Sequence, residues 1–164
     1  MLVDPNTLPD NGIVHSHTSV KDEWLDYNDH MNVAYYVAAF DIGVDETKAT
    51  FGMTEEYIQR TKLSTVALEA HIRYLREAMA GEQLRIETRI VDYDHKRIHY
   101  YQEMYRDDEL LATHESLGIS FDLEQRRTNS FPDTVTEGIQ EMHRRQAQLA
   151  PPEAVGSRVG IRRK

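Results

Sequence analysis

The hydrophobic period of this chain changes part-way along its length, and that change limits the folds open to it. Between a candidate N-cap residue, Asn32, and a candidate stop residue, Gly52, apolar side chains recur at three- and four-residue spacing. The stripe consists of Val33, Tyr36, Val37, Phe40 and Val44. This spacing predicts one long amphipathic helix, because residues three and four apart share a helix face.

A two-residue period follows the helix and continues through four segments. Such alternation predicts half-buried strands, and turn residues separate the segments. The four predicted strands cover residues 66–74, 84–90, 98–105 and 110–121. Looser alternation at 12–21 predicts a first strand, and helical patterns at 54–60 and 134–150 predict two further helices. The expected fold class is therefore α+β, with a long central helix wrapped by a curled antiparallel sheet of about five strands.

The length of 164 residues suits one compact domain. We expect that domain at residues 12–150, with a flexible N-terminal lead at 1–11 and a basic C-terminal tail at 151–164. The chain contains no cysteine, which excludes a disulfide scaffold, a thiol nucleophile and any cysteine-ligated metal site.

The charge and hydropathy of the chain argue against two classes of partner. A formal net charge of -9 disfavours a general nucleic-acid surface. No apolar run approaches the roughly 18 residues of a membrane span, and the first residues lack the basic start of a signal peptide. We therefore expect a cytoplasmic protein that acts neither on nucleic acid nor in a membrane.

A polar segment stands just before the long helix and carries the side chains most suited to chemistry. Asp26, Asn28, Asp29 and His30 precede the N-cap residue Asn32. The unpaired N–H groups and positive dipole end of a helix favour developing negative charge there. A carboxylate beside such a site is the minimum needed for attack on an acyl carbonyl. The alternative is a polar turn whose side chains only cap the helix.

The spacing Asp26-x-Asn28-x-His30-x-Asn32, followed by Tyr36, resembles the signature of hot-dog-fold acyl thioesterases. This superfamily includes the 4-hydroxybenzoyl-CoA and acyl-ACP thioesterases. The order of predicted elements is similar to that fold over residues 12–132. The resemblance therefore implies a hot-dog fold and hydrolysis of a thioester.

Three longer pieces resemble a narrower group, the betainyl-CoA thioesterases of carnitine breakdown, which also occur fused to carnitine dehydrogenases. The pieces are residues 24–40, Glu69-x-His71-x-Arg73-Tyr74-Leu75 and Asp94-x-Lys96-Arg97-x-His99. Related thioesterases with other substrates share part of this pattern. The narrower resemblance implies hydrolysis of a small acyl-CoA, with betainyl-CoA as one candidate, to the free acid and CoA.

The resemblance also implies a role for each matching residue. Asp26 stands where the family has its catalytic carboxylate, which acts either as the nucleophile or as the base for water. Asn28 and His30 match the acyl-ACP branch, where they position water or polarise the carbonyl. The benzoyl-CoA branch has glycine-containing sequence at these positions. The backbone N–H near Val33 matches the oxyanion hole.

A cationic acyl group needs its own pocket, because a quaternary ammonium cannot donate hydrogen bonds and is best held by aromatic faces and a carboxylate. Glu69 is the candidate for the charge, with His71 on the same strand face and Tyr74 opposite by parity. The candidate aromatic residues are Trp24, Tyr27, Tyr35, Tyr36 and Tyr74. The alternative is an ordinary half-exposed strand, with the tyrosines in the core or an interface.

Two groups of basic residues are candidates to contact the phosphates of CoA. Those within the predicted domain are Arg73, Arg76, Lys96 and Arg97, and those in the tail are Arg158, Arg162, Arg163 and Lys164. A solvated end explains the tail equally well. His15 and His17 share a strand face, but no further ligands accompany them, so we expect no metal. The resemblance implies no cofactor beyond the CoA of the substrate.

The family closes an exposed sheet edge by association, so the resemblance implies a homodimer or homotetramer with sites between subunits. Two other functions stay open. One is a hot-dog hydratase or dehydratase, which acts at an acyl double bond. The other is a non-catalytic module that binds an acyl-CoA or a small cation. The sequence does not choose between CoA and an acyl carrier protein as the thiol carrier.

Overall fold

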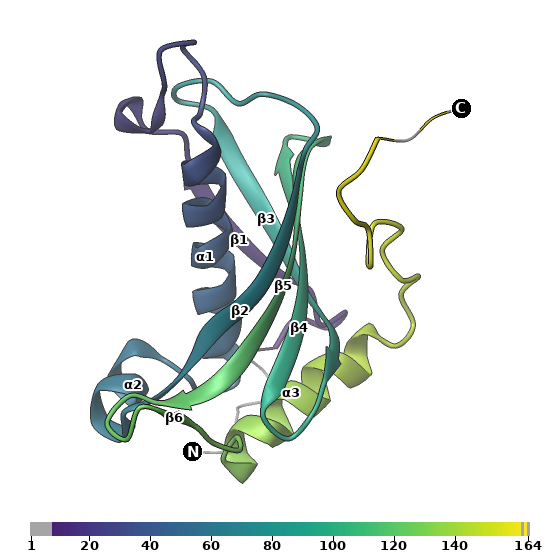
Figure 1. Ribbon diagram of the computed structural model, residues 1–164. Coiled ribbons are helices and arrows are strands. Elements are labelled where there is room, and N and C mark those ends of the chain that lie inside the picture. The colour runs from purple at the N-terminus through teal and green to yellow at the C-terminus, as the bar shows by residue number, and fades with distance from the viewer. Residues whose placement is uncertain (1–7, 162, 164) are drawn as a thin grey trace.

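One antiparallel sheet curls around a single long helix in the computed structural model (Figure 1), which describes residues 8–161 and 163. The strand order is β1-β3-β4-β5-β2, and the short β6 pairs with β5. The strands are β1 Val14–Ser19, β2 Leu63–Tyr74, β3 Gln83–Tyr93, β4 Arg97–Arg106, β5 Glu109–Asp122 and β6 Arg127–Thr128. The helices are α1 Val33–Thr50, α2 Glu55–Thr61 and α3 Asp133–Gln146, with a short 3-10 helix at Asp22–Trp24.

The ends of α1 and α2 follow from their capping residues. Asn32 Oδ1 accepts the Ala34 N–H at 3.0 Å, as an N-cap residue does. The Thr54 hydroxyl accepts the Tyr57 N–H at 3.2 Å at the start of α2. Gly52 follows α1 with a φ of 88°, a left-handed conformation that favours glycine. The observed helices and long strands confirm those predicted from the sequence. β6 and the 3-10 helix are not predicted, because they are too short to show a hydrophobic period.

Two groups of buried side chains fill the space between the helices and the sheet. The first surrounds the N-terminal half of α1 and includes Trp24, Phe40 and Met104. The second lies beyond the C-terminus of α1, where Ile139 and Met142 of α3 pack. β2 pairs with β5 alone and is therefore an edge strand.

Helix α1 approaches the sheet closely at Gly43. A Cβ added there would stand 2.6 Å from Gln102 Nε2 and 2.9 Å from Ile86 Cγ2. Gln102 is buried, and its amide nitrogen donates to the Phe40 carbonyl at 2.9 Å and to Thr88 Oγ1 at 3.0 Å. Glycine at position 43 therefore allows a buried amide of the sheet to bond the backbone of the helix.

Parts of both predicted end segments pack on the domain. Leu8 is buried in the second group of core residues, and Arg145 Nη1 donates to its carbonyl at 2.7 Å. Near the other end, the Gly156 N–H donates to the Glu115 carboxylate at 2.9 Å. The division into lead, domain and tail stays a prediction, and residues 1–7 lie outside the described part of the chain.

Replacing Gly43 with alanine tests the close contact. Helix propensity alone favours alanine by about 1 kcal/mol, but the added methyl group collides with Gln102 and Ile86. We expect Gly43→Ala to lower the free energy of unfolding by about 1–3 kcal/mol in urea titrations. Ala38→Gly, at an exposed position of the same helix, should cost about 1 kcal/mol. A stabilised Gly43→Ala protein would contradict the contact.

Candidate active site

The loop between the 3-10 helix and α1 folds back on itself like a short hairpin. An isolated antiparallel bridge joins its two arms. On the tip side of this bridge, the Asp26 N–H donates to the His30 carbonyl at 3.0 Å. On the side of the helices, the Asn32 N–H donates to the Trp24 carbonyl at 2.9 Å. The loop therefore holds Asp26 and His30 opposite each other, close to the residue that caps α1.

The Asp26 carboxylate is partly buried, and one of its two oxygens is engaged. Oδ1 accepts the backbone N–H of Asn28 at 2.8 Å. Oδ2 accepts no hydrogen bond from residues 8–161, so this oxygen is free to meet a substrate or a water molecule. The exposed side chain of Asn28 lies two residues further along the same turn.

The first turn of α1 offers an unpaired backbone donor next to this loop. The Ala34 N–H is taken by Asn32 Oδ1, and the Tyr35 N–H donates to the Asn32 carbonyl at 2.9 Å. The Val33 N–H has no acceptor in the described part of the chain, and Val33 is 58% exposed. Because the positive end of the helix dipole lies here, this N–H suits a developing negative charge on a bound carbonyl oxygen.

The turn between β2 and β3 braces the loop. His30 Nε2 lies 3.3 Å from Glu77 Oε2, and the Met31 N–H donates to the Ala78 carbonyl at 2.8 Å. Sequence reasoning missed Glu77, because no local pattern in a turn shows which distant side chain it meets.

Trp24 and Tyr27, two of the predicted pocket residues, differ sharply in exposure. Trp24 is buried, stacks on Tyr35 with ring centroids 5.5 Å apart, and has Lys21 Nζ 5.3 Å from its ring centroid. Tyr27, at the tip of the loop, is 94% exposed. Tyr27 is therefore the aromatic residue of this loop with the most ring surface open to a ligand.

Tyr36 and Tyr74 meet edge to face, with ring centroids 5.2 Å apart. Tyr36 is buried, its hydroxyl donates to the Arg76 carbonyl at 3.1 Å, and burial raises its pKa. The Tyr74 hydroxyl donates to the Val33 carbonyl at 3.5 Å, and this residue is 47% exposed. β2 thus presents Tyr74 at the start of α1, on the face of the sheet that the helix covers.

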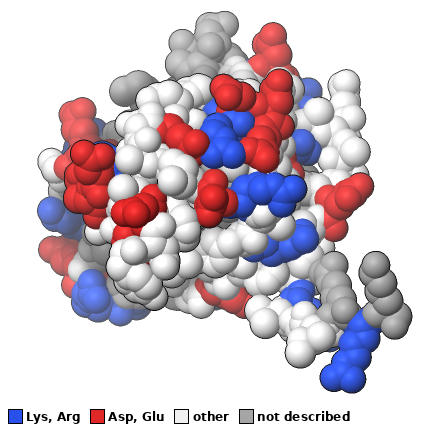
Figure 2. Space-filling view, turned by 90° about the horizontal axis from the view of Figure 1, so that it is seen from above, with Lys and Arg blue, Asp and Glu red and all other residues white. Residues whose placement is uncertain are grey.

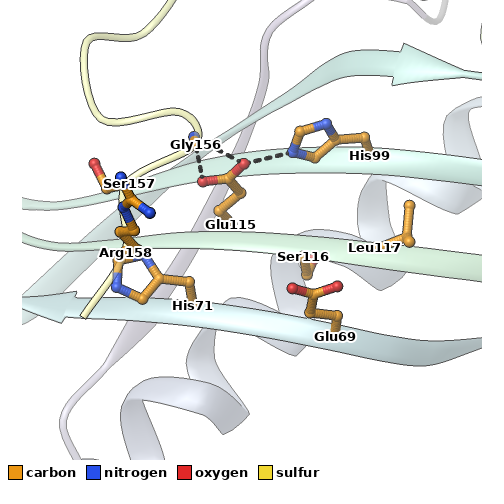
Figure 3. A pocket seen from close by; sticks show the side chains of 9 residues that line it. All are labelled: Glu69, His71, His99, Glu115, Ser116, Leu117, Gly156, Ser157 and Arg158. Carbon is orange, nitrogen blue, oxygen red and sulfur yellow. Dashed lines mark hydrogen bonds and ion pairs between the residues drawn. The ribbon is translucent and has the colours of Figure 1, made fainter. Parts of the chain in front are cut away.

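Glu69 and His71 lie on the opposite face of the sheet from Tyr74, as strand alternation predicts. They line a cavity of about 410 Å³ together with residues of β4 and β5 and the C-terminal segment 156–158 (Figure 3). Within one chain, the sheet therefore separates these two predicted pocket residues from the Asp26 loop.

Arg76 and Arg97, two candidates for the CoA phosphates, lie at opposite ends of the sheet. Arg76 belongs to the turn that braces the loop, and its Nε lies 3.5 Å from Glu109 Oε1. Arg97 starts β4 at the other end, where its Nε donates to Asp94 Oδ2 at 2.7 Å and holds the pKa of that carboxyl well below its usual range. In the view of Figure 2, basic and acidic side chains are interspersed rather than gathered in one basic patch.

Arg73, Lys96 and Arg158 also lie away from the Asp26 loop. Arg73 is on the outer face of β2, and Lys96 is in the turn between β3 and β4. Arg158 lines the cavity of Figure 3, and Arg163 is exposed. Two tail residues are outside the described part of the chain: Arg162 and Lys164.

A second cavity, of about 160 Å³, lies between α1 and β2 on the helix side of the sheet, and we call it the α1–β2 groove. Segment 65–67 of β2 forms part of its wall. Side chains of α1 and of the inner strands complete it: Val37, Asp41, Val44 and Lys48 from α1, with Tyr100 and His114 from the sheet.

The His114 imidazole in this groove is neutral. Its Nδ1 lies 2.8 Å from Gln102 Oε1. Because the Gln102 amide nitrogen donates to Phe40 and Thr88, the amide oxygen accepts, and we assign the His114 proton to Nδ1. The imidazole ring stacks on Phe40 with centroids 5.0 Å apart, and burial lowers its pKa to about 4.

Two kinds of feature are not found in the described residues. No cluster of His, Asp or Glu side chains there is arranged to hold a metal ion. None of the helices described is long and apolar enough to cross a membrane. The loop offers the Asp26 carboxylate, the Asn28 amide, the His30 imidazole and backbone N–H donors.

Comparison with known proteins by sequence gives consistent findings. The family model described as "Thioesterase-like superfamily" matches residues 20–139. Over 162 residues the chain is 33% identical to an L-carnitine dehydrogenase/betainyl-CoA thioesterase of Ruegeria pomeroyi, covering 94% of this chain and 33% of that protein. Over 146 residues it is 27% identical to a betainyl-CoA thioesterase of Pseudomonas aeruginosa, covering 88% of this chain and 92% of that protein. The chain thus spans about a third of the first relative and most of the second.

Comparison by structure supports the fold. A hypothetical protein from Staphylococcus aureus, solved in complex with CoA, superposes with a TM-score of 0.85 at 24% identity, covering 99% of this chain and 98% of that one. The central helix and curled sheet are therefore those of the hot-dog fold, and the fold predicted from the sequence is confirmed.

Neutral His114 makes the stability of the protein depend on pH. Its pKa is about 4 when folded and about 6.5 when unfolded, so the unfolded chain binds more protons between these values. This contribution to stability is present above the unfolded pKa and is lost as the pH falls towards the folded one. From pH 7 to pH 4.5 we expect the wild type to lose about 2 kcal/mol more unfolding free energy than His114→Gln. Equal losses in urea titrations would contradict a buried neutral imidazole.

Proposed function

This chain belongs to the thioesterase-like superfamily, and we propose that it hydrolyses a compact acyl-CoA, with betainyl-CoA as the first candidate. Its likeness to two proteins named for betainyl-CoA thioesterase activity supports the substrate. Two observations on one segment of chain carry the proposal: Asp26, in the loop that leads into α1, has a free carboxylate oxygen, and Val33, at the start of that helix, has an unpaired N–H.

In this proposal the thioester carbonyl oxygen accepts the Val33 N–H, and the helix dipole stabilises the negative charge that develops on that oxygen. Asp26 either attacks the carbonyl carbon or removes a proton from the attacking water. Attack by Asp26 forms a mixed anhydride, which water then hydrolyses to release the acid and regenerate Asp26, whereas attack by water gives the acid directly. In both routes the carbon–sulfur bond breaks, CoA leaves as the thiolate and takes up a proton, and water supplies the second oxygen of the acid. The reaction needs no cofactor beyond the CoA of the substrate.

Neighbouring side chains assist Asp26 in this proposal. The exposed Asn28 amide orients water, and the His30 imidazole, held 3.3 Å from Glu77 Oε2, polarises the carbonyl. Tyr27 and Tyr74 supply open aromatic surface for the acyl group.

Buried and basic residues around the loop support it in other ways. Buried Trp24 and Tyr36 pack beneath the loop and β2 and hold them in place. In this proposal Arg76, in the turn that braces the loop, meets a phosphate of CoA. A CoA thioester as substrate fits the expectation of a cytoplasmic protein, which stays a prediction.

The proposed active unit is a homodimer joined along β2. β2 is an edge strand of 12 residues, and its unpaired backbone groups form a template for another strand. Exposed apolar residues stand near this edge: Val33 and Val37 of α1, with Leu68 and Tyr74 of β2. A two-fold axis across the middle of β2 pairs two copies antiparallel and joins their sheets.

Asp26→Asn removes the carboxylate while keeping the size of the side chain and one acceptor oxygen. We expect thiol release from betainyl-CoA, followed with a thiol reagent, to fall by about 10²–10⁴-fold. The thermal midpoint of unfolding should change little. Asp29→Asn is the matched control, because this exposed loop residue has a φ of 65°, which asparagine also adopts. Its activity should stay near that of the wild type.

A panel of betainyl, aliphatic and aromatic CoA thioesters separates the alternatives. Preferential cleavage of betainyl-CoA supports the proposal as a whole. If the protein cleaves only the aliphatic or aromatic thioesters, the proposed role of Asp26 stands and the proposed betainyl group is wrong. Binding without thiol release indicates a binding module, and change at an acyl double bond without thiol release indicates a hydratase; either result overturns the proposed function.

Leu68→Lys tests the β2 interface, because a charged side chain on an edge strand opposes pairing. We expect the wild type to sediment as a dimer or a larger even-numbered assembly, and the variant to sediment as a monomer. Gln125→Lys, which adds the same charge at an exposed position after β5, should leave the assembly intact. A wild-type protein that is monomeric in sedimentation velocity experiments is the opposite result.

A further inference from the structure

Asp41 is an exposed carboxylate of α1, and it lines the α1–β2 groove. It forms no ion pair or hydrogen bond with residues 8–161. The ammonium group in the same groove is already neutralised, because Lys48 Nζ lies 2.7 Å from Asp45 Oδ1. Partial burial and the nearby Asp45 raise the pKa of Asp41, and they outweigh the Lys48 ammonium, which lowers it. The groove therefore favours a cation.

A second group in the groove also lacks a partner. Tyr100 is buried, and its hydroxyl makes no hydrogen bond within the described residues. A buried polar group without a partner is costly, and such groups usually meet a ligand or water. With the neutral His114 ring also lining it, the groove offers aromatic surface and a carboxylate to a compact guest.

Asp41 lies on the same face of the sheet as the start of α1, whereas Glu69 lines the cavity on the other face. A counter-charge for the acyl group must lie on the face where the thioester binds. Of Asp41 and Glu69, it is Asp41 that lies on the face of the sheet where the thioester binds in this proposal.

One chain alone does not bring Asp41 to its own Asp26 loop. Asp41 follows Val33 by eight residue steps along α1, a rise of about 12 Å, which is longer than a compact acyl group. Within each copy, Tyr74 at the end of β2 contacts Val33, while segment 65–67 near its start lines the groove. When two β2 strands pair antiparallel about a two-fold axis, the end of one lies beside the start of the other. The groove of one copy then borders the Asp26 loop of its neighbour.

We propose that Asp41 selects substrates with a positively charged acyl group, and that it acts from the second copy of the chain. The thioester carbonyl lies at Val33 of one copy, and the quaternary ammonium group enters the α1–β2 groove of the other. Because such a cation cannot donate hydrogen bonds, a carboxylate and aromatic surface are the contacts that recognise it. This inference rests on the proposed function and adds the residue that recognises the charge of the acyl group.

A neutral isostere of the substrate tests the inference. In 3,3-dimethylbutyryl-CoA a carbon atom replaces the nitrogen of betainyl-CoA, so the shape is kept and the charge is removed. For Asp41→Asn we expect kcat/KM for betainyl-CoA to fall by about 10- to 100-fold. For the same variant we expect kcat/KM for the isostere to stay within about twofold of the wild type, because it carries no charge to lose.

Two matched variants control for charge and position. Glu46→Gln removes an exposed carboxylate from the same helix, outside the groove. Glu69→Gln removes a carboxylate from the other face of the sheet. Neither should change the ratio of the two kcat/KM values. A ratio that falls with Glu69→Gln and not with Asp41→Asn overturns the inference.

Mixed dimers test the contribution of the second copy. A dimer of one Asp26→Asn chain and one Asp41→Asn chain has one site with both carboxylates if the site is shared. It has none if each site is built within one chain. With two affinity tags to isolate the mixed dimer, we expect about half of the wild-type activity on betainyl-CoA. Activity at or below that of the Asp41→Asn protein overturns the shared site.

Failure of this inference is distinguishable from failure of the proposed function. If the wild type releases no thiol from any CoA thioester, the proposed function fails. A different result is that the wild type hydrolyses betainyl-CoA while Asp41→Asn lowers both kcat/KM values equally or lowers neither. In that case the proposed function stands, and only the inference that Asp41 selects the charge fails.

Discussion

The contact between helix α1 and the sheet at Gly43 is the constraint on which the rest of the structure depends. Because no side chain intervenes there, Gln102 reaches the Phe40 carbonyl and fixes the helix against the sheet. The position of α1 on the sheet brings the start of the helix to the Asp26 loop. It also leaves an open cavity between α1 and β2, which is the α1–β2 groove. The loop and the α1–β2 groove are thus two consequences of one packing arrangement.

The two functional regions of α1 have opposite electrostatic character, and a betaine thioester has matching halves. Its carbonyl oxygen becomes negative during attack, which suits the unpaired N–H of Val33 and the positive end of the helix dipole. Its ammonium group is positive throughout, which suits Asp41 and the acidic protein as a whole, with its net charge of -9. A site shared between two copies brings these regions together although a single helix keeps them apart. Association and substrate choice are then aspects of the same geometry.

Most of the fold is predictable from the sequence because its signals are local: the helical stripe, the capping residues and the strand alternation. The candidate site is predictable only where one short loop carries it. Strand alternation places Glu69 and Tyr74 on opposite faces, but it does not say which face the helix covers, and the bulge after Ala67 is not visible in the pattern. Glu77 reaches the loop through the tertiary fold alone. Asp41 did leave a signal, since it interrupts the apolar stripe of α1 between two valines one turn away on either side.

A crystal structure with an unreactive betainyl-CoA analogue, in which a methylene group replaces the thioester sulfur, is the decisive test of the shared site. We expect the carbonyl oxygen within hydrogen-bond distance of the Val33 nitrogen and the Asp26 carboxylate facing the carbonyl carbon. We also expect the ammonium group beside Asp41 of the second copy. An acyl group bound on the other face of the sheet, beside Glu69 and His71, would contradict the shared site.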